Sequence, residues 1–467
     1  MGTQRVMPSW WWLPAFIAAA FVLYWPVLHL TPFSDDHSAL WNSGVRGIPW
    51  RNGIFRPLSD LTFRIGYLLG GTAVEGHRAF NITIHAMNAY LLFILFRQWS
   101  PERARSTGLL SGALFLVYPF HQESVVWLVG RESSLGTLSV LLGLVIGGQA
   151  WNERVRSLSL TVILILGLSC YESALLLIPI AFIAVRYQIT ERWREMRTVL
   201  LILTGVGVLY IAVRAWQADA NDYIIGTLVQ HPIHLLANVP KVLARLFLPP
   251  AVDPSIQLLR GAVLAAAFLI GLIWWLRKES SKFARQHIAV WCLLIVTACT
   301  IGYIAGVSTT TSESDRFLYM PSAFLCGLLG IVVPMINSRI LRHGTALVLV
   351  MGSVILMKQN HANWMEASRI TRLCLTELPP APQQGTLWVY GLPDDHHGAF
   401  IFRNGFPEAL ALAGRPSDDV VVITADSTPS AASTTSLMYR GKVHRFGSND
   451  VALHWNGSHY TQVVLSP

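Results

Sequence analysis

The chain has 467 residues, of which 53% are hydrophobic and 13% are charged, and its mean hydropathy is +0.46. Soluble domains contain about a quarter charged residues, so the composition excludes an ordinary soluble protein. It predicts a mostly α-helical protein that crosses a bilayer many times, because lipid forces each spanning segment to pair its own backbone groups. A formal net charge of +9 would be compatible with a nucleic-acid-binding protein. The placement of the basic residues in the loops instead indicates a membrane topology, and no nucleic-acid partner is expected.

Eleven apolar runs approach or reach the length that a helix needs to span a bilayer. They lie at 11–30, 79–97, 107–120, 133–150, 157–171, 173–187, 198–214, 257–276, 287–306, 317–336 and 340–357. Prolines and charged residues, among them Pro240 and Lys241, interrupt a further run at 234–250, which we interpret as an interfacial or re-entrant segment. No small-residue cleavage site follows the first run, which we interpret as a retained span rather than a signal peptide.

The loop charges give these spans an orientation. With the N-terminus in the cytoplasm, sixteen Lys and Arg residues fall on the inner face, whereas the short outer turns carry only Arg131 and Arg316. The positive-inside rule predicts this asymmetry. The first loop, 31–78, and everything after residue 358 would then lie outside the cytoplasm. Apolar residues among polar ones in that loop predict one or two amphipathic helices in the interface.

The first outer loop begins with two adjacent carboxylates, Asp35 and Asp36, followed by His37. Adjacent aspartates repel each other, so one is expected to have a raised pKa unless cations or hydrogen-bond donors surround it. A functional interpretation is a carboxylate base at the membrane surface, with arginines nearby for a phosphate. A structural interpretation is a helix N-cap with solvated loop acids. This stretch alone does not separate the two.

Four further polar clusters fall at the predicted outer ends of spans, at 55–59, 118–123 with 130–133, 171–173, and 312–319. Ionisable groups at span ends are costly to bury and mark either a site or a structural ion pair. Each cluster alone fits both explanations, but a single cavity that opens outward explains all of them together with the aspartates. Besides the aspartates, the polar groups expected around this cavity are His37, His121, Glu123, Glu172 and Asp315.

The composition changes near residue 358. Short runs of β-branched and aromatic residues, separated by Pro and Gly, predict strands. These strands are expected at 386–390, 398–402, 419–424 and 463–465, with a helix near 407–413. The chain is therefore expected to have two parts: a membrane domain at 1–357, with its first outer loop at 31–78, and a small strand-rich domain at 358–467 outside the cytoplasm.

The sequence contains no motif typical of a metal or cofactor site. The cysteines lie mostly in apolar runs without paired spacing and are expected to be small buried side chains. They are Cys170, Cys292, Cys299, Cys326 and Cys374. His-Glu-x-x-His and glycine-rich phosphate loops are absent. His85 and Asn88 are at helical spacing with Asn81, and we interpret them as side chains that hydrogen-bond between helices.

Three stretches, in this order, resemble motifs of the glycosyltransferase C superfamily. They are Phe55-Arg-Pro-Leu58 running through Gly76-His-Arg-Ala-Phe-Asn81 to His85-Ala-Met-Asn88, Tyr118-Pro-Phe-His-Gln-Glu123 followed by Gly130-Arg131, and Asp315-Arg-Phe-Leu-Tyr-Met-Pro-Ser322. With the first-loop aspartates, the likeness covers about residues 1–335 and is greatest to the transmembrane tetratricopeptide-repeat O-mannosyltransferases and their bacterial relatives. The chain departs from them at Tyr171, where the family often has a lysine before the glutamate, and its tail lacks tetratricopeptide repeats. Tail stretches at 392–395 and 398–405 resemble the tails of some bacterial members, without an assigned role.

The resemblance implies an enzyme that takes a sugar from a polyprenyl-phosphate carrier and passes it to a protein, lipid or glycan acceptor at the outer face of a bacterial cytoplasmic membrane. Asp35 or Asp36 would act as base on the acceptor hydroxyl, with inversion at the sugar. We favour Asp36, because the N-terminal amides of the following helix can fix it. The leaving phosphate would be held by Arg56, Arg131 and Arg316. With a monophosphate carrier, these cationic side chains could stabilise the leaving group without a metal, whereas a diphosphate carrier would favour a divalent ion.

Two other classes of protein fit the composition. A polysaccharide polymerase or ligase would also have many spans and large outer loops, but the ordered motifs fit it less well. A transporter of lipid-linked sugars would be expected to show two related halves and polar groups at the membrane midplane, whereas these polar clusters share one face. The sequence leaves open the sugar, the number of phosphates on the carrier, and the acceptor.

Overall fold

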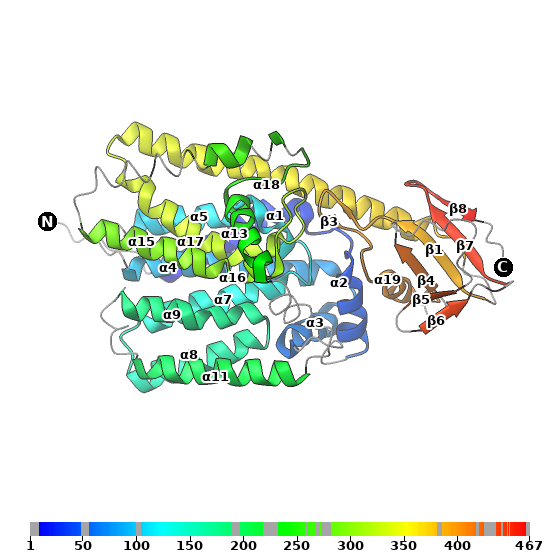
Figure 1. The fold of residues 1–467 in the computed structure, drawn as a ribbon, viewed down its shortest axis with the longest axis horizontal. Coiled ribbons are helices and arrows are strands. Elements are labelled where there is room, and N and C mark those ends of the chain that lie inside the picture. Colours follow the sequence, from blue (N-terminus) through cyan, green and yellow to red (C-terminus); the bar gives the residue numbers. More distant parts are fainter. Residues whose placement is uncertain are drawn as a thin grey trace.

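The computed structural model describes residues 9–47, 56–99, 104–187, 197–217, 232–253, 255–256, 259–264, 266, 271, 282–380, 385–416, 420–424, 436–439, 442–445, 447 and 449–463. Long helices form a bundle, and a small domain with a β-sheet lies beyond one end of it (Figure 1). The helix Asp35–Ser38, which carries the aspartates, and the helix Pro57–Gly70, which Arg56 precedes, lie at this same end.

The first half of the chain forms α1 (Trp12–Tyr24), α2 (Asp35–Ser38), η3 (Ala39–Val45), α3 (Pro57–Gly70), α4 (Val74–Trp99), α5 (Ala104–Val117), η4 (Pro119–His121), α6 (Gln122–Val125), α7 (Arg131–Gly147), α8 (Glu153–Leu168), η5 (Glu172–Leu176) and α9 (Leu177–Arg186). The second half of the bundle contains α11 (Arg197–Gln217), α13 (Pro232–Phe247), α15 (Lys282–Ala298), α16 (Thr300–Ala305), η6 (Asp315–Leu318), α17 (Tyr319–Val332), η7 (Val333–Met335) and α18 (Arg339–Thr376). Each predicted apolar run that falls on described residues contains one of these helices. The run at 257–276 lies mostly outside the described residues.

Five helical segments of the described chain are long and apolar enough to cross a membrane. They are Val74–Gln98, Thr198–Trp216, Ile288–Ala305, Asp315–Met335 and Arg339–Thr376, and shorter apolar helices lie at Trp12–Val27 and Ser106–Val117. The protein is therefore a mostly helical multi-span membrane protein. The count of eleven spans stays a prediction.

Helix α4 lies at the centre of the bundle, where it packs against α1, α5 and α7. Helix α3 has the amphipathic pattern expected of the first loop. It buries Phe63 but exposes Leu68 and Leu69, which suits a helix that lies against lipid. Pro240 sits inside α13, in the segment predicted to be interfacial or re-entrant.

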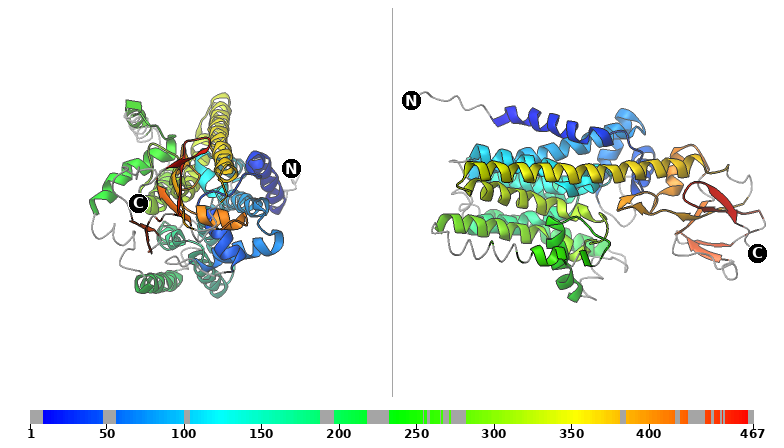
Figure 2. Two further views of the ribbon diagram at one scale, coloured as in Figure 1. Left: turned by 90° about the vertical axis from the view of Figure 1, so that its right-hand side faces the viewer. Right: turned by 90° about the horizontal axis from the view of Figure 1, so that it is seen from above.

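Helix α18 joins the two parts of the protein. It has 38 residues, whereas about 20 suffice to span a bilayer, and Figure 2 shows it running along the bundle and on to the sheet domain. Its second half buries His361, Trp364 and Cys374. Of the cysteines, Cys292 is exposed and the other four are buried, so the prediction of burial was wrong for Cys292.

The C-terminal domain contains a mixed sheet. Its elements are β1 (Leu387–Leu392), β2 (Asp395–His396), β3 (Ala399–Phe400), α19 (Phe406–Leu412), β4 (Val420–Thr424), β5 (Ser436–Tyr439), β6 (Lys442–Arg445), β7 (Val451–Trp455) and β8 (Tyr460–Val463). Four strands pair in the order β4-β1-β7-β8, with β1 parallel to both neighbours. Strands β1, β3 and β4 and helix α19 fall on the predicted strands at 386–390, 398–402 and 419–424 and on the predicted helix near 407–413. Strand β8 overlaps the predicted strand at 463–465 only at Val463, and β2, β5, β6 and β7 were not predicted.

Candidate active site

Arg78 of α4 fixes the loop that leads to the aspartates. Its guanidinium is fully buried and donates hydrogen bonds to backbone carbonyls of the loops on either side. These acceptors are Leu28 at 2.8 Å, Leu30 at 2.8 Å, Thr31 at 3.2 Å and Val126 at 3.0 Å. Buried carbonyls need such partners, so one side chain satisfies two loops and holds them together.

Asn81, one turn further along α4, binds the loop that precedes α7. Its amide donates to the carbonyls of Val125 at 3.3 Å and Trp127 at 3.1 Å. The Trp127 indole in turn donates to the carbonyl of Phe33 at 3.2 Å. The sequence placed Arg78 and Asn81 in a family-like stretch without a role, and their role is to position the loops of the site.

His85 and Asn88 lie deeper in the bundle and connect α4 to α17. His85 Nδ1 lies 2.9 Å from the Tyr319 hydroxyl, and the Asn88 amide donates to the same hydroxyl at 3.2 Å. The prediction that these side chains form interhelical hydrogen bonds is confirmed.

The structure gives the two aspartates different environments. Asp36 is fully buried, and its two carboxylate oxygens accept backbone N–H groups from Phe33 at 3.1 Å and from Val129 at 3.0 Å. Burial raises the pKa of Asp36 to about 7, although these amides oppose the shift. Asp35 is half-buried at the first position of α2. These two backbone contacts suit a structural role for Asp36, and the choice of Asp35 or Asp36 as the base stays a prediction.

The structure buries both His37 and His121. His37 is buried, and its ring stacks on Phe402 of the C-terminal domain at a centroid distance of 5.7 Å. Burial lowers the pKa of His37 to about 3, so the ring is neutral at physiological pH. His121 is buried beside Tyr319 and accepts from or donates to Ser322 Oγ at 2.6 Å. Both rings contribute to packing, and a place for them in the predicted polar cavity stays a prediction.

Arg56 stands at the start of α3 in a cluster of charges. It pairs with Glu132 of α7 and with Glu172 Oε2 at 2.8 Å, and its guanidinium lies 4.6 Å from the centroid of the Tyr171 ring. Arg214 of α11 approaches the second oxygen of Glu172 at 3.6 Å. Glu172 and Glu132 thus hold Arg56 in a fixed orientation. Arg56 Nε is buried without a hydrogen-bond partner among the described residues.

Arg316 in η6 forms a second charged group. Its side chain pairs with Glu123 of α6, and its backbone N–H donates to Glu123 Oε2 at 3.0 Å. The guanidinium lies 5.5 Å from the Trp127 ring and 4.7 Å from the Phe317 ring. Burial raises the pKa of Glu123 despite its ion pair. Because Trp127 also binds Phe33, this one tryptophan stands between Arg316 and the aspartate loop.

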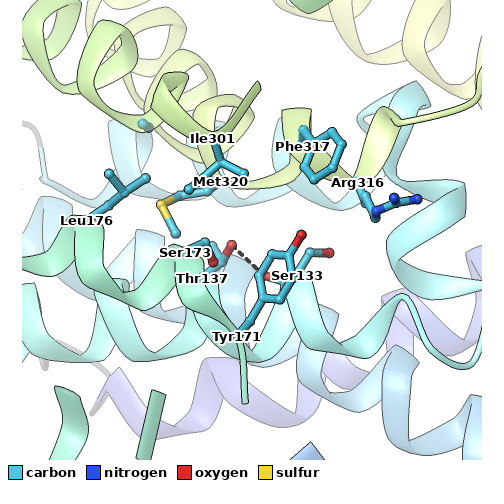
Figure 3. A pocket seen from close by; sticks show the side chains of 10 residues that line it. Ser133, Thr137, Tyr171, Ser173, Leu176, Ile301, Arg316, Phe317 and Met320 are labelled. Atoms are coloured by element: carbon cyan, nitrogen blue, oxygen red, sulfur yellow. Dashed lines mark hydrogen bonds between the residues drawn. The ribbon is translucent and has the colours of Figure 1, made fainter. Parts of the chain in front are cut away.

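Tyr171 lies between the two arginine groups, since the Arg56 guanidinium lies 4.6 Å from its ring centroid and Arg316 lines the same pocket as Tyr171. Burial raises the pKa of Tyr171 to about 12, so the phenol keeps its proton. Figure 3 shows Tyr171 and Arg316 beside a pocket that extends toward apolar side chains. The pocket is lined by Ser133, Thr137, Tyr171, Ser173, Leu176, Ala298, Ile301, Arg316, Phe317 and Met320.

Arg131 was predicted to bind phosphate, but the structure places it elsewhere. Its guanidinium is fully buried and lies 4.1 Å from the Phe63 ring centroid. It donates to Thr62 Oγ1 at 3.1 Å and to the His77 carbonyl at 3.2 Å. Arg131 thus attaches α3 to α4 and α7, and these contacts favour a structural role, whereas phosphate binding by Arg131 stays a prediction.

Asp315, the last predicted cavity group, is buried in an ion pair with Arg245 of α13. Arg245 also donates to the carbonyl of Ser308 at 3.0 Å. The pair therefore fastens the interrupted helix α13 to the loop before α17. Among the described residues, no group of three or more His, Cys, Asp or Glu side chains is arranged to hold a metal ion.

Together these features define a multi-span membrane protein with a charged site at one end of its bundle, built from the first loop and the loops before α7, α9 and α17. No protein-family model matches the chain. Protein O-mannosyl-transferase Tmtc1 from Drosophila melanogaster is 34% identical over 180 residues, which cover 34% of this chain and 21% of that protein. Protein O-mannosyl-transferase TMTC4 from Mus musculus is 33% identical over 136 residues, which cover 26% of this chain and 18% of that protein. The chain thus spans about a fifth of these curated relatives, and a distant relation to this group is confirmed.

Two solved structures align with most of the chain at low sequence identity. One is ArnT from Cupriavidus metallidurans bound to undecaprenyl phosphate, with a TM-score of 0.49, 14% identity, and coverage of 95% of this chain and 93% of that chain. The other is the oligosaccharyltransferase AglB from Archaeoglobus fulgidus in complex with an inhibitory peptide and a dolichol-phosphate, with a TM-score of 0.45, 11% identity, and coverage of 86% and 65%. These identities transfer no residue role.

Proposed function

We propose that this protein is a membrane glycosyltransferase that moves a sugar from a polyprenyl-phosphate carrier to an acceptor at the outer face of the membrane. One observation carries the proposal. Tyr171 and Arg316 line a pocket whose other wall is apolar, and the Arg56 guanidinium lies 4.6 Å from the Tyr171 ring centroid. A cationic end next to an apolar wall suits a ligand that has a phosphate head and a lipid tail. The distant relation to protein O-mannosyl-transferases supports the same class.

Unsatisfied polar atoms beside Tyr171 also favour a polar ligand. Arg56 Nε and Ser173 Oγ are buried without a hydrogen-bond partner among the described residues. Buried donors are costly to leave unpaired, and a phosphate oxygen would accept from them. An arginine carries five N–H donors in a planar fork, so Arg56 and Arg316 can keep their glutamate partners and still bind a phosphate.

Asp35 is our candidate for the base. As the acceptor hydroxyl attacks the anomeric carbon, its proton passes to the Asp35 carboxylate, and the bond from that carbon to the phosphate oxygen breaks. The phosphate leaves with the electron pair, and attack from the opposite side inverts the sugar. Arg56 and Arg316 stabilise the leaving phosphate through charge-assisted hydrogen bonds. Asp36, held by the amides of Phe33 and Val129, keeps the turn in place.

A monophosphate carrier fits this arrangement, because two arginines can supply the positive charge. With a diphosphate carrier, we expect a divalent ion to be bound together with the ligand. We also propose the finer topology: eleven spans, a cytoplasmic N-terminus, and a C-terminal domain outside the cytoplasm of a bacterial cell. The asymmetry of the loop charges supports this orientation.

The test is binding and transfer by the full chain in lipid nanodiscs. Polyprenyl-phosphate mannose, radiolabelled in the sugar, serves as the donor, and membranes from cells of the source organism that lack the gene supply the acceptor. We expect saturable donor binding that polyprenyl phosphate competes for, followed by transfer of label. Failure of both binding and transfer with mannose, glucose and aminoarabinose donors would remove the proposed function.

A further inference from the structure

One segment of the C-terminal domain, residues 393–405, packs on the candidate active site. It contains β2 and β3, which pack against α18, and the turn before α19, the helix that packs against α2 (Figure 1). Its sequence includes the tail stretch to which the sequence assigned no role. The segment touches both the aspartate loop and the loop that carries Arg316.

The contact with the aspartate loop falls on Ser34, the residue directly before Asp35. Ser34 has a φ of +45°, which side chains other than glycine rarely adopt, and such strain persists only where the surroundings impose it. Here the Ser34 N–H donates to the carbonyl of Ile401 at 2.9 Å, and the Asn404 N–H donates to Ser34 Oγ at 3.2 Å. The backbone angle that aims the two aspartates is therefore held by a segment about 370 residues away in the chain.

Gly405 makes the approach to this turn possible. Its φ is +83°, and a Cβ atom at this position would lie 2.4 Å from the Ser34 carbonyl oxygen and 3.3 Å from His37 Cβ. Phe402 of the same segment stacks on the His37 ring. The residues on both sides of the aspartate pair are thus in contact with the C-terminal domain.

The same segment binds the Arg316 loop from its other side. Arg403 forms an ion pair with Glu313, and the His397 carbonyl accepts the Ser312 N–H at 3.5 Å. Gly398, with a φ of +89°, lies so close that a Cβ atom would approach the Ser312 nitrogen to 2.5 Å. Glu313 precedes Arg316 by three residues, so these contacts set the position of the loop that presents the arginine.

We infer that residues 393–405 are a positioning element of the site, which sets the spacing between the Asp35 turn and Arg316. A domain that only recruited an acceptor would not need to bind both loops. This inference rests on the proposed function, because it assumes that the aspartate turn and the arginine act on one substrate. It makes the C-terminal domain part of the catalytic assembly.

The first test compares Gly405→Ala with Gly414→Ala in the full chain in nanodiscs. Gly414 also has a positive φ, of +71°, but a Cβ atom there meets nothing within 4 Å, so it controls for backbone strain alone. The donor dissociation constant and the single-turnover transfer rate are measured separately. We expect Gly405→Ala to lower the transfer rate about a hundredfold, as a displacement of about 1 Å can, with donor affinity within about twofold. Gly414→Ala should transfer at the wild-type rate.

A second pair of variants addresses the Arg316 loop and does not depend on Gly405→Ala folding. Arg403→Ala should weaken donor binding several-fold, and the exchanged pair Arg403→Glu with Glu313→Arg should restore it. Wild-type transfer by Gly405→Ala, equal losses in Gly405→Ala and Gly414→Ala, or unchanged donor binding by Arg403→Ala would overturn the positioning role. Absence of donor binding and transfer in the wild-type protein would instead refute the proposed function, so the two failures are distinguishable.

Discussion

The substitution Asp36→Asn should destabilise the protein, whereas Asp35→Asn should stop the reaction. Asp36 uses both oxygens to accept amides, from Phe33 and from Val129. Asparagine keeps one of these acceptors and turns an NH₂ donor toward the other amide. Leaving one buried N–H unsatisfied costs about 1–3 kcal/mol. We therefore expect Asp36→Asn to lower the free energy of unfolding by about that amount.

The pH dependence of stability should reveal the same carboxyl group. Its folded pKa of about 7 lies above the value of about 3.9 expected in the unfolded chain. Because the pKa is higher in the folded protein, the folded protein binds this proton more tightly than the unfolded chain does. The resulting stabilisation is complete at pH values below the unfolded pKa and is lost as the pH rises through the folded pKa. The unfolding temperature of the wild type should therefore fall between about pH 4 and pH 7, and Asp36→Asn should remove this component.

Asp35→Asn keeps the size of the side chain but removes the proton acceptor. Loss of a general base lowers the rate by about a hundredfold to ten-thousandfold, so transfer should fall by that factor while donor affinity and unfolding temperature stay near wild type. Thermal unfolding in detergent, donor binding and single-turnover transfer separate these effects. Near-normal transfer by Asp35→Asn, or full stability in Asp36→Asn, would refute the assignment of roles.

Three further predictions follow from the site. Arg56→Ala should weaken binding of polyprenyl phosphate by about 1.5–3 kcal/mol, measured by titration in nanodiscs. The control Arg369→Ala, which removes an exposed intrahelical ion pair, should leave the affinity unchanged. Equal affinities of the two variants would place the phosphate elsewhere. Arg131→Ala should lower the unfolding temperature, because it strips partners from buried carbonyls, while the folded fraction binds donor normally, and a selective loss of affinity would contradict its structural role. A reporter enzyme active only in the cytoplasm, fused after Gly414, should be inactive, and activity there would exclude the proposed orientation.

The sequence predicted the helices well, because long apolar runs leave few alternatives in a bilayer. It also predicted that the outer clusters share one membrane face, and that face itself stays a prediction. Glu123, Glu172, Arg56 and Arg316 do lie in charged groups at one end of the bundle. Convergence could be predicted because topology fixes which loops share a face, although it does not fix which side chains touch.

The roles of neighbouring residues could not be predicted, because they depend on distant contacts. The orientations of Asp35 and Asp36 follow from the backbone of Ser34, which Asn404 binds from the far end of the chain. Arg131 stands next to Glu132 in the sequence and looked like a site residue, but α3 covers it through Thr62. The pattern of Arg and Glu along the chain could not reveal this burial.

The missed strands have a local explanation. Strand β6 (Lys442–Arg445) carries two basic residues in four positions, and β7 (Val451–Trp455) contains Ala and His, so neither has the continuous β-branched pattern typical of a strand. Strand β7 is nevertheless a central strand, because it pairs with β1 on one side and β8 on the other. Its tertiary neighbours, more than its own composition, therefore account for its conformation.

The central claim is that one lipid-linked sugar binds with its phosphate at Arg56 and Arg316 and its sugar near Asp35. The most direct test is a cryo-electron microscopy structure of the full chain in nanodiscs with a non-hydrolysable polyprenyl-phosphonate sugar. We predict density for the phosphonate within hydrogen-bond distance of Arg56 and Arg316, and the anomeric carbon facing Asp35 across a space that can hold an acceptor hydroxyl. A phosphonate bound away from both arginines, or a sugar that points away from the aspartate turn, would contradict the account.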